Sequence, residues 1–351
     1  VAAGEQALVD GQPARAAALF SRAIGGIGDG EAEIERSAYL GLARAHEDLG
    51  DFEGAIRAYD AYLAHFSEEA IQVVARRGAC EAELADWEGS ASSFAQVLEI
   101  GGDALLPSQR VEALTRQGFA IYQLGRLEQA DALFAQADER YQQATDSGEE
   151  RFSDTYFVAM ARFYRAAIVH LQFREVAIRL PEAQMSKDFE RKLELLEQAQ
   201  SAYNRVIEAR HVYWVSAAGF QLGSLFEEFY DAVMYAPVPD WLDEAQRRTY
   251  YAELEEQLRP VIEKAVWVFE KNLETARKLG YDNQFVELTQ ERLASLQSIM
   301  LGRDGSGAPV PRLAPPGPRD AGGDLDGPRE DLGVDMPAIE RKLFVPLPTT
   351  L

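Results

Sequence analysis

The residue types that most often carry chemistry are isolated from one another in this sequence. The four histidines have no second His or Cys at the spacing of a metal site, and they are His46, His65, His170 and His211. Cys80 is the only cysteine, which excludes an intrachain disulfide and a cysteine metal cluster. A free cysteine inside a helix usually acts as a small buried hydrophobic side chain. We therefore expect no metal and no cofactor.

The remaining motifs also indicate no catalytic site. Neighbouring carboxylates such as Glu149-Glu150 and Glu255-Glu256 fall on polar faces, where we expect solvated charge. The glycine-rich stretch 25–30 lacks the Lys-Ser/Thr pair of a phosphate-binding loop, and no predicted strand precedes it. The serines have no neighbouring base pattern. The sequence nominates no catalytic residue, and we expect a protein that is not an enzyme.

The charge balance limits the class of partner. The chain has 35 Lys and Arg against 58 Asp and Glu, a formal net charge of −23. Nucleic acid and anionic lipid headgroups would be repelled by this charge, so neither is expected as a partner. The acidic surface either keeps the protein soluble or forms a docking face for a basic partner. No run approaches the ~20 apolar residues that cross a bilayer.

The elements that would position any functional residue are helix hairpins. Residues 39–66 read as two short amphipathic helices joined by a tight turn at Gly50. Large and small residues alternate at fixed offsets, with Tyr39, Leu42-Ala43, Ala55 and Tyr59 at the packing positions. This pattern resembles the tetratricopeptide (TPR) repeat, a unit of about 34 residues. One such hairpin cannot bury its own apolar stripe, so it requires neighbours.

Three further hairpins with the same pattern are predicted in the first half, at about 3–24, 69–100 and 108–141. Their turn residues are Gly11, Ala85 and Gly125, so the four turns recur at nearly constant intervals. Ala85 stands where a glycine would favour a left-handed turn, so the third turn is the one whose left-handed geometry the sequence supports least.

Longer helices are expected in the second half. The spacing predicts helices at about 152–179 and 186–209, then a pair that packs through Leu222-Gly223 and Phe269. Between the members of that pair lie the insertion 236–242 and an acidic helix that ends near Pro260. A last helix at 282–300 would cap the open end of the stack.

The composition changes at Gly302. Nine of the fifteen prolines follow this residue, together with many Gly and Asp, which predicts a disordered or extended tail. The last stretch, 339–348, is apolar again and includes Leu343 and Phe344. It either docks back onto the helices or serves as a linear motif for a partner.

The TPR resemblance implies that the first helix of each repeat lines a concave inner wall. At those positions the second to fourth repeats carry Leu40, Arg44, Glu47, Asp48, Glu83, Glu112, Phe119, Tyr122 and Gln123. Phe119 and Tyr122 beside acidic and amide groups suit a peptide or helix with apolar and basic character. The alternative is that these side chains pack against neighbouring repeats or face water. Arg44 is the only cation among them, so a carboxylate-gripping wall is not expected.

Aromatic residues are dense between 212 and 241. Most of them recur at helical spacing and are expected in the core. Trp241 is the ring least expected to be buried, because Pro237 and Pro239 hold its loop out of the helical pattern. It is therefore a further candidate for contact with a partner, as are Leu343 and Phe344 in the tail. A loop Trp can also pack back on its own domain.

Residues 150–300 resemble the elongated second half of envelope-associated TPR proteins from myxobacteria and related delta-class bacteria. The pieces that carry this resemblance are 196–207 (LEQAQSAYNRVI), 236–239 (APVP) and 271–283 (KNLETARKLGYDN). Some members of that group look like periplasmic scaffolds of gliding or transport machines. The resemblance implies a periplasmic or envelope-associated location, with the cytoplasm as the alternative. The sequence begins at Val1, which fits a removed export signal or lipid anchor as well as an omitted upstream segment.

Together these features predict an all-α, right-handed solenoid with regular repeats at 1–147, elongated hairpins and a capping helix at 148–301, and a tail at 302–351. The expected function is a scaffold that holds other proteins of a bacterial cell-envelope complex, through its concave wall and its tail. The alternative is a stand-alone peptide- or substrate-binding adaptor that acts transiently. An enzyme would need a cluster of polar residues that the sequence does not show.

Overall fold

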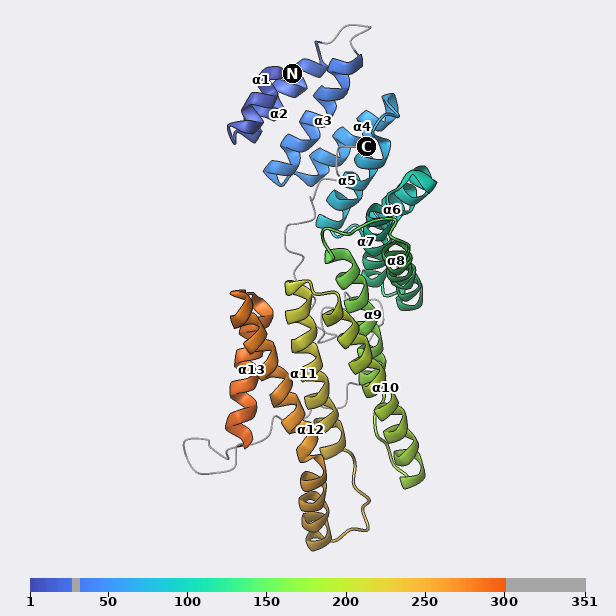
Figure 1. The fold of residues 1–351 in the computed structure, drawn as a ribbon, viewed down its shortest axis with the longest axis vertical. Helices are drawn as coiled ribbons and strands as arrows, with labels where there is room; N and C mark the ends of the chain where they lie inside the picture. The colour runs from blue at the N-terminus through green and yellow to red at the C-terminus, as the bar shows by residue number, and fades with distance from the viewer. Residues whose placement is uncertain (27–31, 301–351) are drawn as a thin grey trace. The chain divides into compact units, whose positions relative to one another are not determined.

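The computed structural model describes residues 1–26 and 32–300, and its regular elements there are all helical (Figure 1). The chain divides into two compact units, with the boundary between Phe152 and Ser153. The first unit contains α1 (Ala2–Val9), α2 (Pro13–Ile24), α3 (Ala32–Leu49), α4 (Phe52–His65), α5 (Ala70–Glu83), α6 (Trp87–Gly101), α7 (Pro107–Gln123) and α8 (Leu127–Ser147). A short 3-10 helix, η1 (Gly102–Ala104), follows α6.

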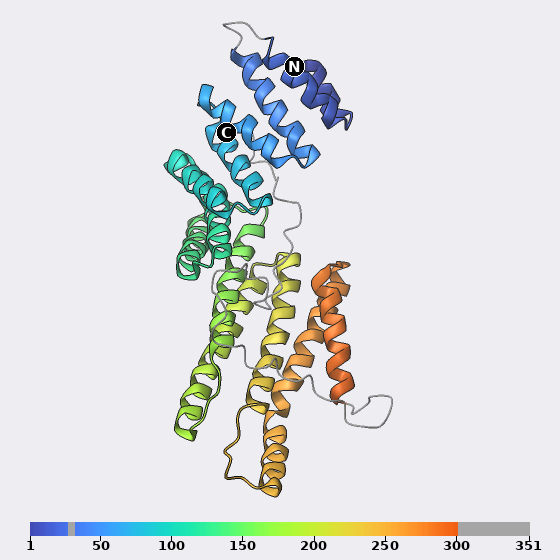
Figure 2. The ribbon, with the colours of Figure 1, turned by 180° about the vertical axis from the view of Figure 1, so that it is seen from behind.

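Within the described residues the second unit contains α9 (Tyr156–Glu175), α10 (Glu182–Glu208), α11 (Val212–Met234), α12 (Glu244–Leu279) and α13 (Gln284–Met300). Within each unit every helix packs against the next one in the chain, so the helices form a series of hairpins (Figure 2). The predicted all-α array of stacked hairpins is therefore confirmed for the described residues. The predicted tail, with Leu343 and Phe344, lies outside them.

The four predicted turns have one backbone geometry. Gly11, Gly50, Ala85 and Gly125 all have left-handed φ values, of 67°, 72°, 56° and 74°. At each turn this residue donates its N–H to the carbonyl three residues back, and the next residue donates to the carbonyl five back, for example Asp51 N to His46 O at 2.9 Å. This is the Schellman arrangement that ends many helices. Ala85 adopts it despite its Cβ.

Small residues let the helices of the first unit approach closely. Gly118 of α7 faces the ring of Phe134 of α8, where an added Cβ would lie 2.8 Å from the ring. A core cluster under the second hairpin contains Ala43, Tyr59 and Tyr62, and it extends to Cys80 of the third hairpin. Burial of such large side chains contributes on the order of 1.5–3 kcal/mol each. Each hairpin therefore depends on its neighbour for stability, as the sequence pattern predicted.

The second unit has a more aromatic core. Trp214 of α11 is buried and lies 5.1 Å, between ring centroids, from Phe163 of α9. Phe163 in turn lies 6.0 Å from Tyr203 of α10. Such tilted ring pairs add stability beyond the area they bury. The aromatic residues of α9 and α11 thus join three helices into one core, and most of them are buried as predicted.

The predicted end of a helix near Pro260 is wrong. One helix, α12, runs through this proline for 36 residues. Pro260 removes one backbone donor, but Leu258 on one side and Ala265 on the other are both buried. Packing of the same helix face on both sides of the proline explains why the helix continues. At the end of the unit, α13 buries Phe285, Thr289 and Leu296 and exposes a polar face, as expected of a cap.

Candidate protein-binding surfaces

The candidate residues on α3 lie in different environments. Arg44 and Asp48 are exposed, whereas Leu40 is half-buried and packs against the core cluster of the second hairpin. Glu83, at the end of α5, is exposed as well. Arg44, Asp48 and Glu83 are therefore the predicted wall residues of α3 and α5 that a partner could reach.

Glu47 is a structural residue in this fold. Its side chain is only 4% exposed, and its carboxylate accepts a hydrogen bond of 2.6 Å from the Tyr59 hydroxyl. Arg76 of α5 forms an ion pair with the same carboxylate, and its Nε donates to the Tyr59 oxygen at 2.8 Å. Burial and the nearby Glu47 raise the pKa of Tyr59. The cluster joins the second hairpin to the third, so Glu47 does not present its charge to a partner.

Cys80 belongs to this polar cluster. It is buried, and its thiol donates to Glu47 Oε1 at 3.6 Å. Burial and the Glu47 carboxylate raise the pKa of the thiol, so the reactive thiolate is disfavoured. The expected role as a small buried side chain agrees with this position.

The two aromatic wall candidates on α7 are in the interior. Phe119 and Tyr122 are buried, and Trp87 of α6 meets the Phe119 ring edge-on, with centroids 5.6 Å apart. Glu112 is half-buried and pairs with Arg116 at 2.8 Å. These side chains therefore pack within the first unit, which is the alternative that the sequence left open. Gln123, the last residue of α7, is half-buried.

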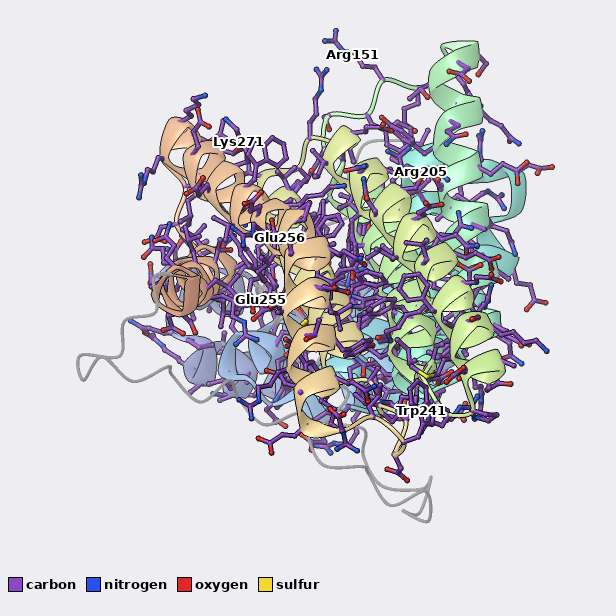
Figure 3. All side chains as sticks on the ribbon, turned by 90° about the horizontal axis from the view of Figure 1, so that it is seen from below. Arg151, Arg205, Trp241, Glu255, Glu256 and Lys271 are labelled. Carbon is purple, nitrogen blue, oxygen red and sulfur yellow. The ribbon has the colours of Figure 1, made fainter. Side chains whose placement is uncertain are left out.

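Trp241 is exposed, as expected, with 69% of its surface accessible. It lies in the connection between α11 and α12, just before Asp243, which caps α12 through a 2.8 Å bond to the N–H of Gln246 (Figure 3). The structure adds Trp267 of α12, which is 56% exposed and which the sequence interpretation missed. The helical period contained the signal, because residues 265 and 269 on the core face place 267 on the opposite side.

A polar network around the buried His170 connects three helices of the second unit. His170 of α9 is fully buried, with Nδ1 3.1 Å from the Tyr203 hydroxyl and Nε2 3.1 Å from a Glu228 oxygen. Arg174 donates to the same carboxylate at 2.7 Å. Burial alone would raise the pKa of Glu228, but the bonds from His170 and Arg174 outweigh it and bring the pKa to about 2. Burial lowers the pKa of His170, so a neutral imidazole bridges the two partners.

A buried lysine lies at the C-terminal end of α9. Lys192 of α10 is 3% exposed, and its Nζ donates to the carbonyl oxygens of Phe173 and Val176 at 2.8 and 2.9 Å. The same Nζ lies 4.0 Å from the centre of the Phe173 ring. Burial lowers the pKa of Lys192 to about 8. The lysine supplies a donor to the Val176 carbonyl and a further donor to the Phe173 carbonyl, which also accepts from the Val176 N–H at 3.4 Å. This is a structural task at a helix end.

In the part of the chain that the structure describes, no group of three or more His, Cys, Asp and Glu side chains is placed to hold a metal ion. No described helix is both long enough and apolar enough to span a bilayer. The candidate residues that a partner could reach are exposed charges on α3 and α5 and two exposed indole rings, one on α12 and one in the loop before it.

Comparison with known proteins finds similarity among solved structures only. No family model matches it, and no curated protein matches its sequence. A solved structure to which it is similar is that of a tetratricopeptide repeat protein from Parabacteroides merdae. The two share 14% sequence identity with a TM-score of 0.39, over 85% of this chain and 97% of the other.

Proposed function

We propose that this protein is a non-enzymatic scaffold that binds other proteins, and that it does so within a bacterial cell-envelope complex. The observation that carries the proposal is the exposure of Trp241 and Trp267, each more than half accessible. Exposed indole rings on a folded surface leave apolar area in water, and Trp is enriched among the residues that dominate binding energy at protein interfaces. The two rings lie on α12 or directly before it.

The exposed charges of the first unit form a second surface for partners. Arg44 and Asp48 on α3 and Glu83 on α5 carry both signs. Charges at the rim of an interface mainly steer the approach of a partner and set its register. We infer that this surface selects partners, while the indole rings of the second unit provide most of the affinity.

The envelope assignment and a periplasmic location rest on the resemblance of residues 196–207, 236–239 and 271–283 to envelope-associated repeat proteins. A cytoplasmic location is the alternative. The native upstream sequence tests the location directly, because an export signal or a lipidation site would place the protein in the envelope.

Site-specific photocrosslinking tests the scaffold function. A photoreactive residue at position 241 or 267 should crosslink to protein partners in the native cell, whereas the same residue at Val9, which is 82% exposed on α1, serves as the control. Trp241→Ala with Trp267→Ala should then weaken recovery of the same partners without changing helicity. No crosslinked partner at 241 or 267, or equal crosslinking at position 9, would contradict the proposal.

The stand-alone adaptor is the second candidate function. A scaffold should co-purify with its partners in a fixed ratio at high salt, whereas a transient adaptor should lose them.

Deletion of residues 303–351 tests whether the tail serves a partner or packs on the helices. If the tail serves a partner, helicity and thermal unfolding should stay unchanged while recovery of that partner falls. A large loss of stability would instead show that the tail packs as part of the fold.

A further inference from the structure

The first part of α12 extends beyond the helix on which the rest of it packs. Asn272 of α12 donates to the Ser216 carbonyl of α11 at 3.0 Å, and the Lys264 ammonium lies 4.4 Å from the centre of the Phe226 ring. The two helices approach most closely where Gly219 faces Asn272 and Gly223 faces Phe269. Continuing this antiparallel register places Met234, the last residue of α11, opposite about Gln257. Residues 244–256 therefore project past the end of α11 by roughly 20 Å. This projecting segment is visible at the start of α12 in Figure 1, after the loop from α11.

One face of α12, along the projecting segment and the turn that follows it, carries a regular pattern of charge. At 100° per residue, five exposed residues fall within an arc of about 80°. They are Glu244, Arg248, Ala252, Glu255 and Arg259, which we call the 244–259 stripe. The side chains of Glu244 and Arg248 are 85% and 76% exposed. Figure 3 shows Glu255 on the helix and Trp241 in the loop before it.

The stripe is complementary to itself when it is reversed. If two copies of the segment run antiparallel about a twofold axis between Tyr251 and Ala252, Glu244 of one faces Arg259 of the other. In the same register Arg248 of one faces Glu255 of the other, and the twofold axis repeats both pairs. All four facing positions thus have opposite charge. A surface that matches itself in this way is what a twofold-symmetric contact requires.

We propose that the 244–259 stripe is a self-association surface, and that its partner is the same stripe of a second copy of this chain. Ala252 at the centre allows close approach of the two helices, and the half-exposed ring of Tyr251 lies beside it. Within one chain Arg248 pairs with Glu244 and Arg259 with Glu256, each at 2.6 Å. These intrahelical ion pairs are exposed and contribute little to stability. Replacing them by ion pairs between two chains therefore costs little free energy.

Charge-swap variants of the full chain test this proposal. Glu244→Arg with Glu255→Arg makes the stripe wholly basic, and Arg248→Glu with Arg259→Glu makes it wholly acidic. Each variant places like charges opposite one another in a homodimer, whereas an equimolar mixture restores opposite charges. Glu190→Arg with Glu197→Arg on α10 is the matched control, because both residues are exposed and the change in net charge equals that of the basic variant.

Sedimentation velocity should show a concentration-dependent dimer for the parent chain and for the control. Each charge-swap variant alone should dimerise at least about tenfold more weakly, and the mixture should regain the parent affinity as a heterodimer. Circular dichroism on every variant excludes misfolding as the cause. A parent chain that stays monomeric up to about 1 mM, swaps without effect, or a mixture that remains monomeric would each overturn the proposal. Loss of partner crosslinking at 241 and 267 would leave it intact, because those positions lie outside the stripe.

Discussion

The turn between α5 and α6 offers a direct test of the repeat geometry. Ala85 occupies the left-handed position that glycine occupies in the other three turns, with φ of 56°. A non-glycine residue in this conformation costs about 1–2 kcal/mol, and glycine costs roughly 0.5–1 kcal/mol more backbone entropy on folding. The substitution Ala85→Gly should therefore stabilise the first unit by about 0.5–1 kcal/mol. Ala85 is exposed, so little packing is lost.

The reciprocal change should have the opposite sign. A Cβ added at Gly50 would meet nothing within 4 Å, so Gly50→Ala tests backbone strain without a steric clash. It should destabilise the first unit by about 0.5–1 kcal/mol. Gly50→Val should cost a few kcal/mol, roughly 2, because a β-branched side chain is disfavoured further in this turn.

Thermal unfolding by circular dichroism and hydrogen exchange at the ends of α3 and α5 provide the measurements. For a unit of this size about 1 kcal/mol corresponds to a shift of roughly 2–4 °C. Ala132→Gly is the control, since the same change at an exposed position inside α8 should destabilise by about 1 kcal/mol. If Ala85→Gly destabilised the protein as Ala132→Gly does, the left-handed turn would not exist. An unchanged transition in Gly50→Val would likewise count against the repeat register.

Three further predictions concern the buried side chains of Cys80 and Lys192 and the half-buried side chain of Glu228. Cys80 should resist alkylation at pH 8 in the folded protein and react once it is denatured, because burial raises the pKa of its thiol; rapid labelling of native protein would contradict its placement. Lys192→Met should cost about 1–3 kcal/mol, since the Val176 carbonyl loses its lysine donor and the Phe173 carbonyl keeps a 3.4 Å bond from the Val176 N–H in place of two bonds. Because the pKa of Lys192 falls from 10.5 unfolded to about 8 folded, the unfolded chain binds more protons between these values. The parent should therefore gain stability relative to Lys192→Met as pH rises from about 8 to 10.5, and a falling difference in chemical unfolding would refute this sign. Glu228→Gln should destabilise the second unit by about 2–3 kcal/mol at pH 7. This difference should shrink as the pH falls from about 4.5 towards 2, because the carboxylate itself becomes protonated over this range. A difference independent of pH would show that the charge of Glu228 does not contribute to stability.

Local patterns predicted the hairpins because each repeat uses short-range rules. The alternation of small and large residues, the turn positions 11, 50, 85 and 125, and the exposure of Trp241 follow from spacing, glycine and proline. The continuation of α12 through Pro260 could not be predicted from local patterns, because a proline in a helical pattern ends some helices and is tolerated in others. Packing on both sides of it decided the outcome, and that packing is not visible in the local sequence.

The candidate surface was harder to predict than the fold. Glu47 and Phe119 occupy positions that face a partner in the expected repeat. In the structure Glu47 forms an ion pair with Arg76 of the next hairpin, and Phe119 packs against Trp87. Arg76 lies 29 residues from Glu47 in the chain, so spacing alone could not reveal the contact.

The sequence by itself determined that this protein consists of paired helices with left-handed turns, because these properties depend on residues within one or two helical turns of each other. Only the tertiary structure decided which side chains face the solvent and which meet another helix. It buried His170 beside Glu228, exposed Trp267 and extended α12 past α11. Those outcomes depend on the register between helices that are distant in the chain, and no local pattern specifies that register.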